Sequence, residues 1–172
     1  MLPFRSIPLR ILAHGHGLVA TPPVVAQSVA HSVSVREEVE LGVPPARAWD
    51  AIRDYLAWPA WHPAFASTRL VSGDGRSKGS VRVLTAKDGA QFTEELLRFD
   101  AVHHRLKYRI LESPAPVIGY ESTLEVKPSK AGSTVVWSSR FQVRDGTPEA
   151  DAKKAIVGIY RLGLDNLATA IE

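Results

Sequence analysis

Residues 91–128, QFTEELLRFDAVHHRLKYRILESPAPVIGYESTLEVKP, decide the fold of this chain. Within them, apolar and polar side chains alternate over Gln91–Asp100, His104–Glu112 and Val117–Lys127. A period of two residues is typical of a β-strand with one buried face. The breaks between these runs are short, and parallel neighbours need a crossover of about a dozen residues or more. The pattern therefore predicts an antiparallel sheet.

The flanking sequence continues the same alternation. Further strands are expected at Val33–Leu41, Ala66–Ser72, Gly79–Lys87 and Thr134–Arg144. Turn-forming sequences separate these runs, among them Asp88-Gly89. Such sequences join neighbouring antiparallel strands.

Helices are expected at two places. The first follows Pro45, where Ala48, Trp49, Ile52, Tyr55 and Leu56 recur at helical spacing. Trp58-Pro59 is expected to end this helix, and a short turn follows. A long helix is predicted over Thr147–Glu172. Its expected apolar stripe is Ala155, Ile159, Leu162, Leu167 and Ile171.

This order of elements predicts an α+β fold. We expect a curved seven-stranded antiparallel sheet wrapped around the long C-terminal helix, with two short helices after strand 1. The apolar stripe of the helix must be buried against one face of the sheet. Because a strongly curved sheet rarely closes completely over a single helix, we expect a ligand cavity between them.

The composition describes a globular domain without cysteine chemistry. The 172 residues are 45% hydrophobic and 23% charged, which is typical of a soluble domain with its own core. The absence of cysteine excludes disulfides, zinc–thiolate sites, iron–sulfur clusters and cysteine nucleophiles. The 21 Lys and Arg residues are interspersed with 18 Asp and Glu residues, so no nucleic-acid partner is expected. We also expect no integral membrane segment, metal or cofactor, because the corresponding motifs are missing.

Residues 1–30 differ from the rest of the chain. They contain no acidic residue, two arginines precede the apolar stretch Ile11–Ala26, and a small-x-small pattern ends at Ala30. This order resembles an export signal, which would favour a periplasmic over a cytoplasmic location. Histidines and a Pro-Pro pair interrupt the apolar stretch, which equally favours an N-terminal extension or a start codon assigned too early. We therefore divide the chain into residues 1–30 and a ligand-binding domain of residues 31–172.

Strand parity assigns side chains to the cavity. In the strand 79–87, Val81, Val83 and Thr85 are expected inward, with Arg82 pointing to solvent. The inward faces of the strands are mainly apolar and carry a few polar groups. These polar groups are Glu37, Glu94, Glu112, Tyr108, Tyr120 and Ser122. In the strand 134–144 the expected apolar side is Val135, Trp137 and Phe141, and a bulge there would invert half of this assignment.

Three residues are candidates for acid–base chemistry. A carboxyl group on an apolar face should have a raised pKa, so Glu94 and Glu112 are candidate acid–base residues or ligand anchors. The alternative is a glutamate that reaches water at a strand end or pairs with an arginine. His62 lies in a loop beside the expected cavity mouth and is a candidate general base. The alternative is an exposed structural histidine, because one histidine defines no catalytic geometry.

Several short motifs occur in a set order along the chain. They are Pro45-x-x-x-Trp49, Trp61-His62-Pro63, Gly79-Ser80-Val81-Arg82, Thr93-Glu94-x-Leu96, Leu106-x-Tyr108-x-Ile110, Tyr120-x-x-Thr123-Leu124, Trp137-x-x-x-Phe141 and Gly158-x-Tyr160-x-x-Gly163-Leu164. In this order, Pro44–Glu172 resembles the START/Bet v 1-like (SRPBCC) superfamily, in its polyketide cyclase/dehydrase-like branch. The resemblance implies a helix-grip fold with a hydrophobic cavity between the sheet and the C-terminal helix.

Two groups within this superfamily are informative. The chain is similar to periplasmic accessory proteins of bacterial methanol oxidation, and more distantly to plant abscisic-acid receptors. Glu94, Tyr120 and Ser122 fall where those receptors place polar pocket residues. Their carboxylate-binding lysine falls at Ala66, and their gate loop is replaced by the short segment 86–89. Recognition of the same acidic hormone is therefore not expected.

The predicted function is the binding of a hydrophobic small molecule that is lipid-like, aromatic or polyketide-like. One alternative is a cyclase or dehydratase in which Glu94, Glu112 or His62 moves protons. Another is an accessory protein that acts through its surface on a partner oxidoreductase. The sequence specifies no oligomeric state. The expected ligand-binding residues are Trp61, Val83, Phe92, Glu94, Tyr108, Ile110, Tyr120, Ser122, Trp137, Ile159 and Tyr160.

Overall fold

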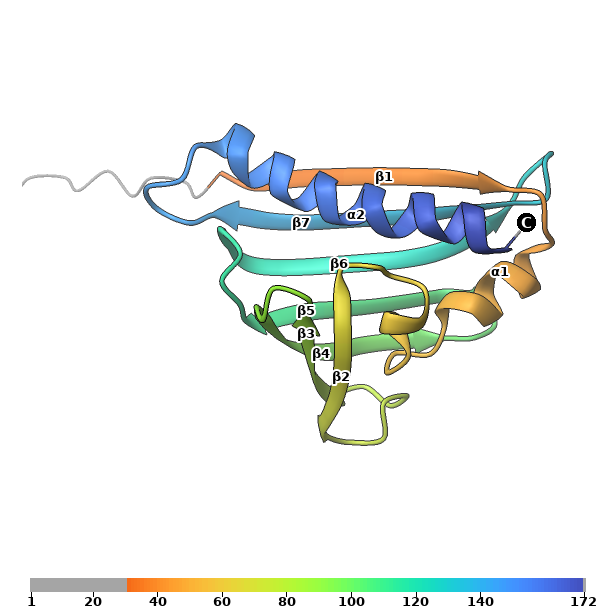
Figure 1. Ribbon diagram of the computed structural model, residues 1–172, viewed down its shortest axis with the longest axis horizontal. Helices are drawn as coiled ribbons and strands as arrows, with labels where there is room; N and C mark the ends of the chain where they lie inside the picture. Colours follow the sequence, from red (N-terminus) through yellow and green to blue (C-terminus); the bar gives the residue numbers. More distant parts are fainter. Residues whose placement is uncertain (1–30, 172) are drawn as a thin grey trace, which may run out of the picture.

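The computed structural model describes residues 31–171, so the predictions for residues 1–30 lie outside the described residues. Seven antiparallel strands form one sheet in the order β1-β7-β6-β5-β4-β3-β2 (Figure 1). The strands are β1 (Val33–Leu41), β2 (Phe65–Ser72), β3 (Val81–Ala86), β4 (Gln91–Asp100), β5 (Arg105–Glu112), β6 (Val117–Pro128) and β7 (Ser133–Val143). The helices are α1 (Pro45–Ile52), the 3₁₀ helix η1 (Trp58–Ala60) and α2 (Glu149–Ile171). The predicted α+β helix-grip fold is confirmed.

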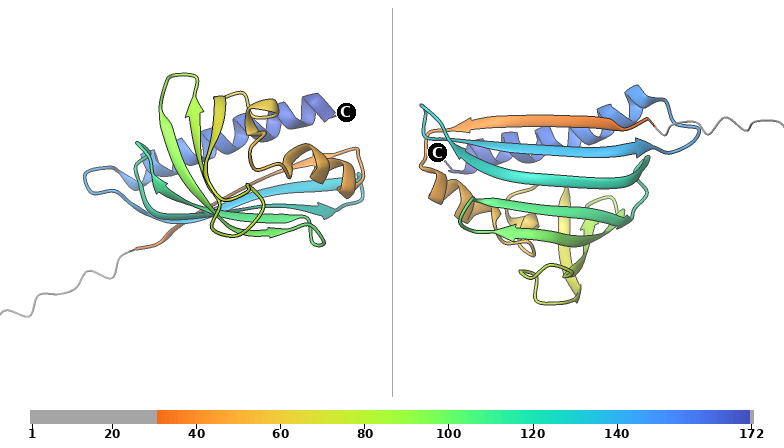
Figure 2. Two further views of the ribbon diagram at one scale, coloured as in Figure 1. Left: turned by 90° about the horizontal axis from the view of Figure 1, so that it is seen from below. Right: turned by 180° about the vertical axis from the view of Figure 1, so that it is seen from behind.

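The sheet curves around α2, which lies lengthwise over β1 and β7 (Figures 1 and 2). The core between them is built from the concave face of the sheet and one stripe of the helix. That buried stripe is Ala152, Ile156, Tyr160, Gly163, Leu164, Leu167 and Ile171. The predicted stripe was partly wrong, because Leu162 is 47% exposed and Ala155 is also exposed. Apolar residues occupy more than one face of this helix, so spacing alone left its rotation ambiguous.

The segment between β1 and β2 is less helical than predicted. Helix α1 ends at Ile52 rather than continuing to Leu56. The Asp54 carboxylate accepts a hydrogen bond from the Leu56 amide at 2.9 Å, which favours a turn over a further helical turn. The turn brings Trp58 into the core through η1, where the side chain is 1% exposed.

The predicted orientation of β3 was wrong. Arg82 is fully buried and pairs in the sheet with Glu94, while Leu84 pairs with Phe92. Residues that pair across an antiparallel ladder share a face, so Arg82 and Leu84 point to the core. Val83 therefore points to the opposite face. The sequence reasoning assumed an exposed arginine, and a buried ion pair with Glu94 overturns that assumption.

The predicted inward orientation of Glu112 was also wrong. Ile110 pairs with Glu94, whereas Glu112 pairs with the adjacent Thr93, so β5 carries an extra residue at Leu111. Such a bulge inverts the parity of the residues that follow it. Glu112 is consequently exposed.

Gly163 permits an unusually close approach of the loop before β2 to α2. A Cβ atom on Gly163 would lie 2.5 Å from His62 Cδ2 and 3.2 Å from Trp137 Cζ3. Gly158, one and a half turns earlier in the same helix, has no atom within 4 Å of an added Cβ. The loop that carries His62 can therefore lie on the helix only because position 163 has no side chain.

The two helix glycines should respond in opposite ways to substitution by alanine. We expect Gly163→Ala to lower the free energy of unfolding by about 1–3 kcal/mol, because it overpacks the His62 contact. We expect Gly158→Ala to leave stability unchanged or raise it by up to about 1 kcal/mol, as in an open helix position. Urea unfolding of both variants measures this difference. Equal destabilisation by the two substitutions would contradict the close contact.

Candidate ligand-binding cavity

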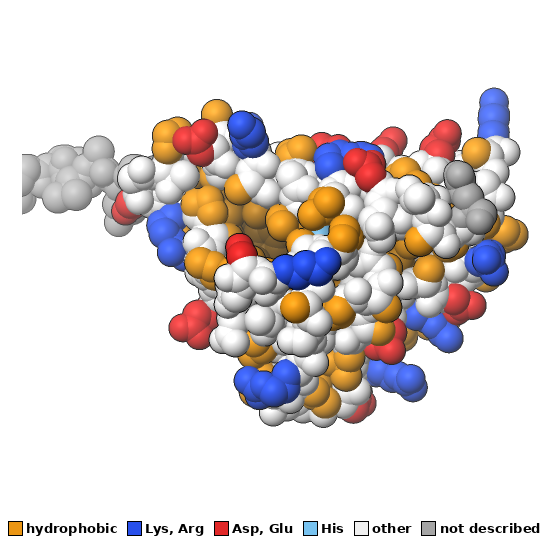
Figure 3. Space-filling model, viewed as in Figure 1, with side chains coloured by type: hydrophobic (Ala, Val, Ile, Leu, Met, Phe, Trp, Pro, Cys, Tyr) orange, Lys and Arg blue, Asp and Glu red, His pale blue; other side chains and the backbone are white. Residues whose placement is uncertain are grey.

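A cavity of about 260 Å³ lies between the concave face of the sheet and the N-terminal half of α2. The space-filling view shows a hollow with hydrophobic side chains around it (Figure 3). Its lining residues are Trp58, Phe65, Asp88, Ala90, Phe92, Glu94, Tyr108, Ile110, Pro114, Ala115, Pro116, Tyr120, Trp137, Ala155, Ile156, Ile159 and Tyr160. The lining is therefore mostly aromatic and aliphatic, with a few polar groups.

The structure brings together most of the residues that the sequence placed here. Those that line the cavity are Phe92, Glu94, Tyr108, Ile110, Tyr120, Trp137, Ile159 and Tyr160. Trp61 and Ser122 are buried behind that lining, and Val83 lies on the other face of the sheet. The part that each residue takes in binding remains a prediction.

Sequence reasoning missed lining residues that lie outside the strand pattern. Trp58 and Phe65 come from η1 and the start of β2, and Pro114–Pro116 come from the loop between β5 and β6. Trp58 was used only as a helix-ending signal before Pro59, although its size and apolar character favour burial.

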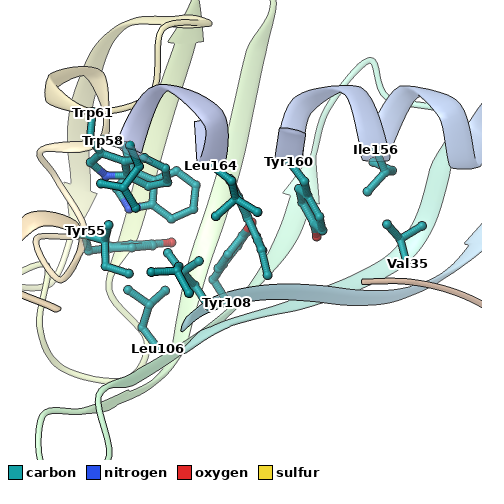
Figure 4. Close-up of a cluster of buried hydrophobic side chains, with 14 of the residues drawn as sticks. Val35, Tyr55, Trp58, Trp61, Leu106, Tyr108, Ile156, Tyr160 and Leu164 are labelled. Atoms are coloured by element: carbon teal, nitrogen blue, oxygen red, sulfur yellow. The ribbon is translucent and has the colours of Figure 1, made fainter. Parts of the chain in front are cut away.

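Aromatic side chains form one wall of the cavity. The Trp137 ring stacks on Tyr160 with centroids 4.3 Å apart, and Trp58 meets Trp137 edge-on at 5.3 Å. Trp61 packs behind Trp58 at 5.3 Å (Figure 4). This packing fixes each ring by its neighbours. The rings of this wall consequently hold one another in place and do not move into the cavity.

Arg82 and Glu94 form an ion pair at the inner end of the cavity. The Arg82 Nε and Nη2 atoms donate to Glu94 Oε2 at 3.0 and 2.7 Å. The guanidinium lies between the rings of Tyr55 and Trp58, with its Cζ atom 3.8 and 3.9 Å from their centroids, and also donates to the Tyr55 carbonyl. Arg82 is therefore held on several sides by groups that favour a cation.

Glu94 is both a partner of Arg82 and part of the cavity lining. Its side chain is 5% exposed. Burial raises the pKa of this carboxyl, while the Arg82 guanidinium opposes that rise. Both contacts from Arg82 reach Oε2, and no group among residues 31–171 donates a hydrogen bond to Oε1. Oε1 is thus an acceptor that a bound molecule can use.

Three tyrosines surround Ser122 in a buried hydrogen-bond network. The Ser122 hydroxyl donates to the Ser138 carbonyl at 2.9 Å, so its oxygen accepts from Tyr160 at 3.0 Å and from Trp137 Nε1 at 3.0 Å. Tyr160 in turn accepts from Tyr120. Each hydroxyl proton in this chain has one acceptor.

Tyr108 joins the same network through Trp137. Its oxygen accepts a hydrogen bond from Trp137 Nε1 at 3.1 Å. Burial raises the pKa of Tyr108, as it does for Tyr120 and Tyr160, so all three are neutral at physiological pH. The polar groups of the cavity lining therefore include the phenol of Tyr108 and the carboxylate of Glu94.

His62 is a buried structural residue rather than the exposed one that the alternative reading expected. It is fully buried, its Nε2–H donates to the Ile159 carbonyl at 3.0 Å, and its Nδ1 accepts from the Ala64 amide at 3.2 Å. Both ring nitrogens are occupied in the neutral form. Burial lowers the pKa of His62 to about 4. His62 does not line the cavity, which removes the geometric basis for a general base.

Glu37, one of the polar groups expected to face the cavity, has an arginine partner. It pairs with Trp137 in the β1–β7 ladder, so it has the inward parity expected from the sequence. Its carboxylate lies 3.4 Å from Arg161 of α2. Glu37 therefore links β1 to α2 by an ion pair and does not line the cavity.

Neither a metal cluster nor a membrane-spanning helix occurs in the described part of the chain. Residues 31–171 contain no group of three His, Asp or Glu side chains placed to hold a metal ion. None of their helices is long and apolar enough to cross a membrane.

Comparison with known proteins identifies relatives of the same fold. A family model described as polyketide cyclase/dehydrase and lipid transport matches residues 32–172. The abscisic acid receptor PYL2 of Arabidopsis thaliana is 27% identical over 136 residues, which are 74% of this chain and 71% of the receptor. The MLP-like protein 423 of the same plant is 26% identical over 113 residues, 61% of this chain and 73% of that protein. Among solved structures, XoxI from Bacillus cereus superposes with a TM-score of 0.69 at 28% identity, covering 81% of this chain and 94% of XoxI.

The buried ion pair predicts a specific pattern of stability changes. We expect Arg82→Met to lower the free energy of unfolding by about 3–5 kcal/mol, because Glu94 is left buried without a partner. The double variant Arg82→Met with Glu94→Leu should recover most of that loss. Denaturant unfolding measures both, with Arg36→Met in the exposed Arg36–Glu38 pair as a control that should change stability by about 1 kcal/mol or less. A double variant no more stable than the single one would contradict the pairing.

The burial of His62 predicts a loss of stability in acid. Its pKa is about 4 in the folded protein against 6.5 in the unfolded chain, so the unfolded state binds the proton first as pH falls. The free energy of unfolding should therefore decrease by about 3 kcal/mol between pH 6.5 and 4 through this residue alone. The measurement is the difference in pH dependence between wild type and His62→Gln. If the free energies of unfolding of wild type and His62→Gln changed in the same way between pH 6.5 and 4, a neutral buried His62 would be ruled out.

Proposed function

Because the chain belongs to the polyketide cyclase/dehydrase and lipid transport family, we propose that it binds a small apolar molecule carrying a hydrogen-bond donor. The site is the cavity between α2 and the sheet. The observation that carries the proposal is the free Oε1 of Glu94, a buried acceptor in an otherwise apolar lining.

The apolar lining sets the size and character of the ligand. A volume of about 260 Å³ lies just below the range of roughly 300–1,000 Å³ common for small-molecule sites. Aromatic rings contribute much of the wall, and burial of apolar surface supplies most of the affinity in such sites. A compact aromatic or alicyclic molecule fits within this volume.

The charged groups favour an uncharged ligand over an anion. In the described part of the chain, the charged residues that line the cavity are Asp88 and Glu94, and both are acidic. Arg82, the partner of Glu94, is already bound to Oε2 and covered by aromatic rings. A ligand hydroxyl or N–H can donate to Glu94 Oε1, whereas a ligand carboxylate finds no Lys or Arg side chain among the described residues that line the cavity. Abscisic acid, the ligand in the name of PYL2, would meet this obstacle.

Blocking the cavity should abolish binding. Ala155 and Ala170 are both exposed alanines of α2, but Ala155 lines the cavity and Ala170 does not. We expect Ala155→Trp to reduce the affinity for the neutral fluorescent probe N-phenyl-naphthylamine at least tenfold, because the indole fills the space. Ala170→Trp should bind as wild type does. Unchanged binding in Ala155→Trp, measured by fluorescence titration, would overturn the proposed site.

A hydroxyl group on the ligand should add affinity through Glu94. A hydrogen bond to a charged acceptor is worth about 1.5–3 kcal/mol. We therefore expect naphthol to bind about tenfold or more tightly than methylnaphthalene, which has the same rings and no donor. The double variant Arg82→Met with Glu94→Leu should bind the two equally. Titration calorimetry tests this, and equal wild-type affinities would argue against Glu94 as the anchor.

A further inference from the structure

Strands β5 and β6 separate before they end. Their ladder runs from the Arg105–Glu125 pair to the Arg109–Glu121 pair and stops there. Both strands nevertheless continue, β5 to Glu112 and β6 back to Val117. Each continues to pair on its other side, with β4 and β7 respectively.

Two irregularities open this gap. The bulge at Leu111 shifts the end of β5, and a second register shift occurs in β6 between Ile118 and Glu121. Gly119 within that shift has a φ of 61°, a left-handed conformation that side-chain-bearing residues rarely adopt. The backbone N–H and C=O groups of β5 and β6 that face this gap have no partner on the opposite strand. Such groups need water or a ligand to satisfy their hydrogen bonds.

A second pocket of about 260 Å³ lies in this gap. We call it the outer pocket; it is lined by Ile110, Leu111, Glu112, Ser113, Val117, Ile118, Gly119, Tyr120 and Arg144. Ile110 and Tyr120 also line the inner cavity. Ile110 and Tyr120 are therefore part of the lining of both spaces, next to the place where the β5–β6 ladder stops.

The lining of the outer pocket is amphipathic. Leu111 and Ile118 are 49% and 48% exposed, which is unusual for large apolar side chains on neighbouring strands. Arg144 donates one hydrogen bond from its side chain, to the Ser113 carbonyl at 3.3 Å, and pairs with no carboxylate in residues 31–171. Glu112 lies in the same lining, so the pocket carries both signs of charge. A polar, uncharged group suits this setting better than an anion.

We propose that the outer pocket is a second subsite for an elongated ligand with a polar group at each end. This inference rests on the proposed function, because the apolar body of such a ligand occupies the inner cavity with one polar end at Glu94. The other end passes Ile110 and Tyr120 between β5 and β6. There it hydrogen-bonds the unpaired backbone groups and the Arg144 guanidinium. A compact ligand occupies the inner cavity alone.

The test compares a long and a compact probe across two matched variants. The probes are a decanediol with a hydroxyl group at each end, and N-phenyl-naphthylamine. Leu111→Trp fills the outer pocket, whereas Leu70→Trp adds the same side chain at a partly exposed site on β2. We expect Leu111→Trp to weaken decanediol binding at least tenfold and to leave N-phenyl-naphthylamine binding unchanged. Leu70→Trp should leave both unchanged.

The outcomes separate this inference from the proposed function. Equal decanediol affinities in wild type and Leu111→Trp, with N-phenyl-naphthylamine still bound in the inner cavity, would overturn the second subsite alone. Weakening of both probes by Leu111→Trp would also overturn it, because the effect would not depend on ligand length. Failure of wild type to bind either probe would overturn both proposals. Perturbation by decanediol of the Gly119 amide resonance in wild type, and its absence in Leu111→Trp, would support the subsite independently of affinity.

Discussion

The Arg82–Glu94 ion pair is the constraint on which the rest of the structure depends. Two charges without access to water are tolerated only when they are paired and hydrogen-bonded. Here the guanidinium needs Tyr55 and Trp58 on its faces and a backbone carbonyl at its edge. That requirement fixes the segment between α1 and β2 against the sheet. The same pair keeps a carboxylate at the inner end of the cavity, so one interaction links the fold to the site.

The cavity persists because its surroundings hold each other in place. His62 attaches the loop before β2 to the Ile159 carbonyl of α2, and Gly163 lets that contact form. On the other side, Trp137 is fixed by Tyr160 and by hydrogen bonds to Tyr108 and Ser122. Neither group can move inward without breaking buried hydrogen bonds. The space between them therefore stays open instead of collapsing.

Much of the fold could be predicted from the sequence, because alternation and turn chemistry are local properties. The strand limits at Gln91–Asp100 and the long terminal helix follow directly from them. Features that depend on partners distant in sequence could not be predicted from this local pattern. Arg82 is charged and alternates with apolar residues, so local pattern placed it outside, and only Glu94 on the next strand explains its burial. The bulge at Leu111 likewise leaves no signal in the residues themselves, which is why Glu112 was placed on the wrong face. In contrast, Glu94, Tyr108 and Tyr120 were placed correctly, because burial alternates regularly over the residues 94–96, 106–108 and 120–126 that contain them.

The central claim is that a ligand donor group meets Glu94 Oε1 inside an apolar cavity. A crystal structure of the protein with naphthol tests it most directly. The account predicts the naphthol rings beside Trp58 and Tyr160, with the hydroxyl oxygen within hydrogen-bond distance of Oε1, roughly 3.0 Å or less. Naphthol bound with its hydroxyl away from Glu94, or a cavity closed by Trp137 and Tyr120 with naphthol elsewhere, would contradict it.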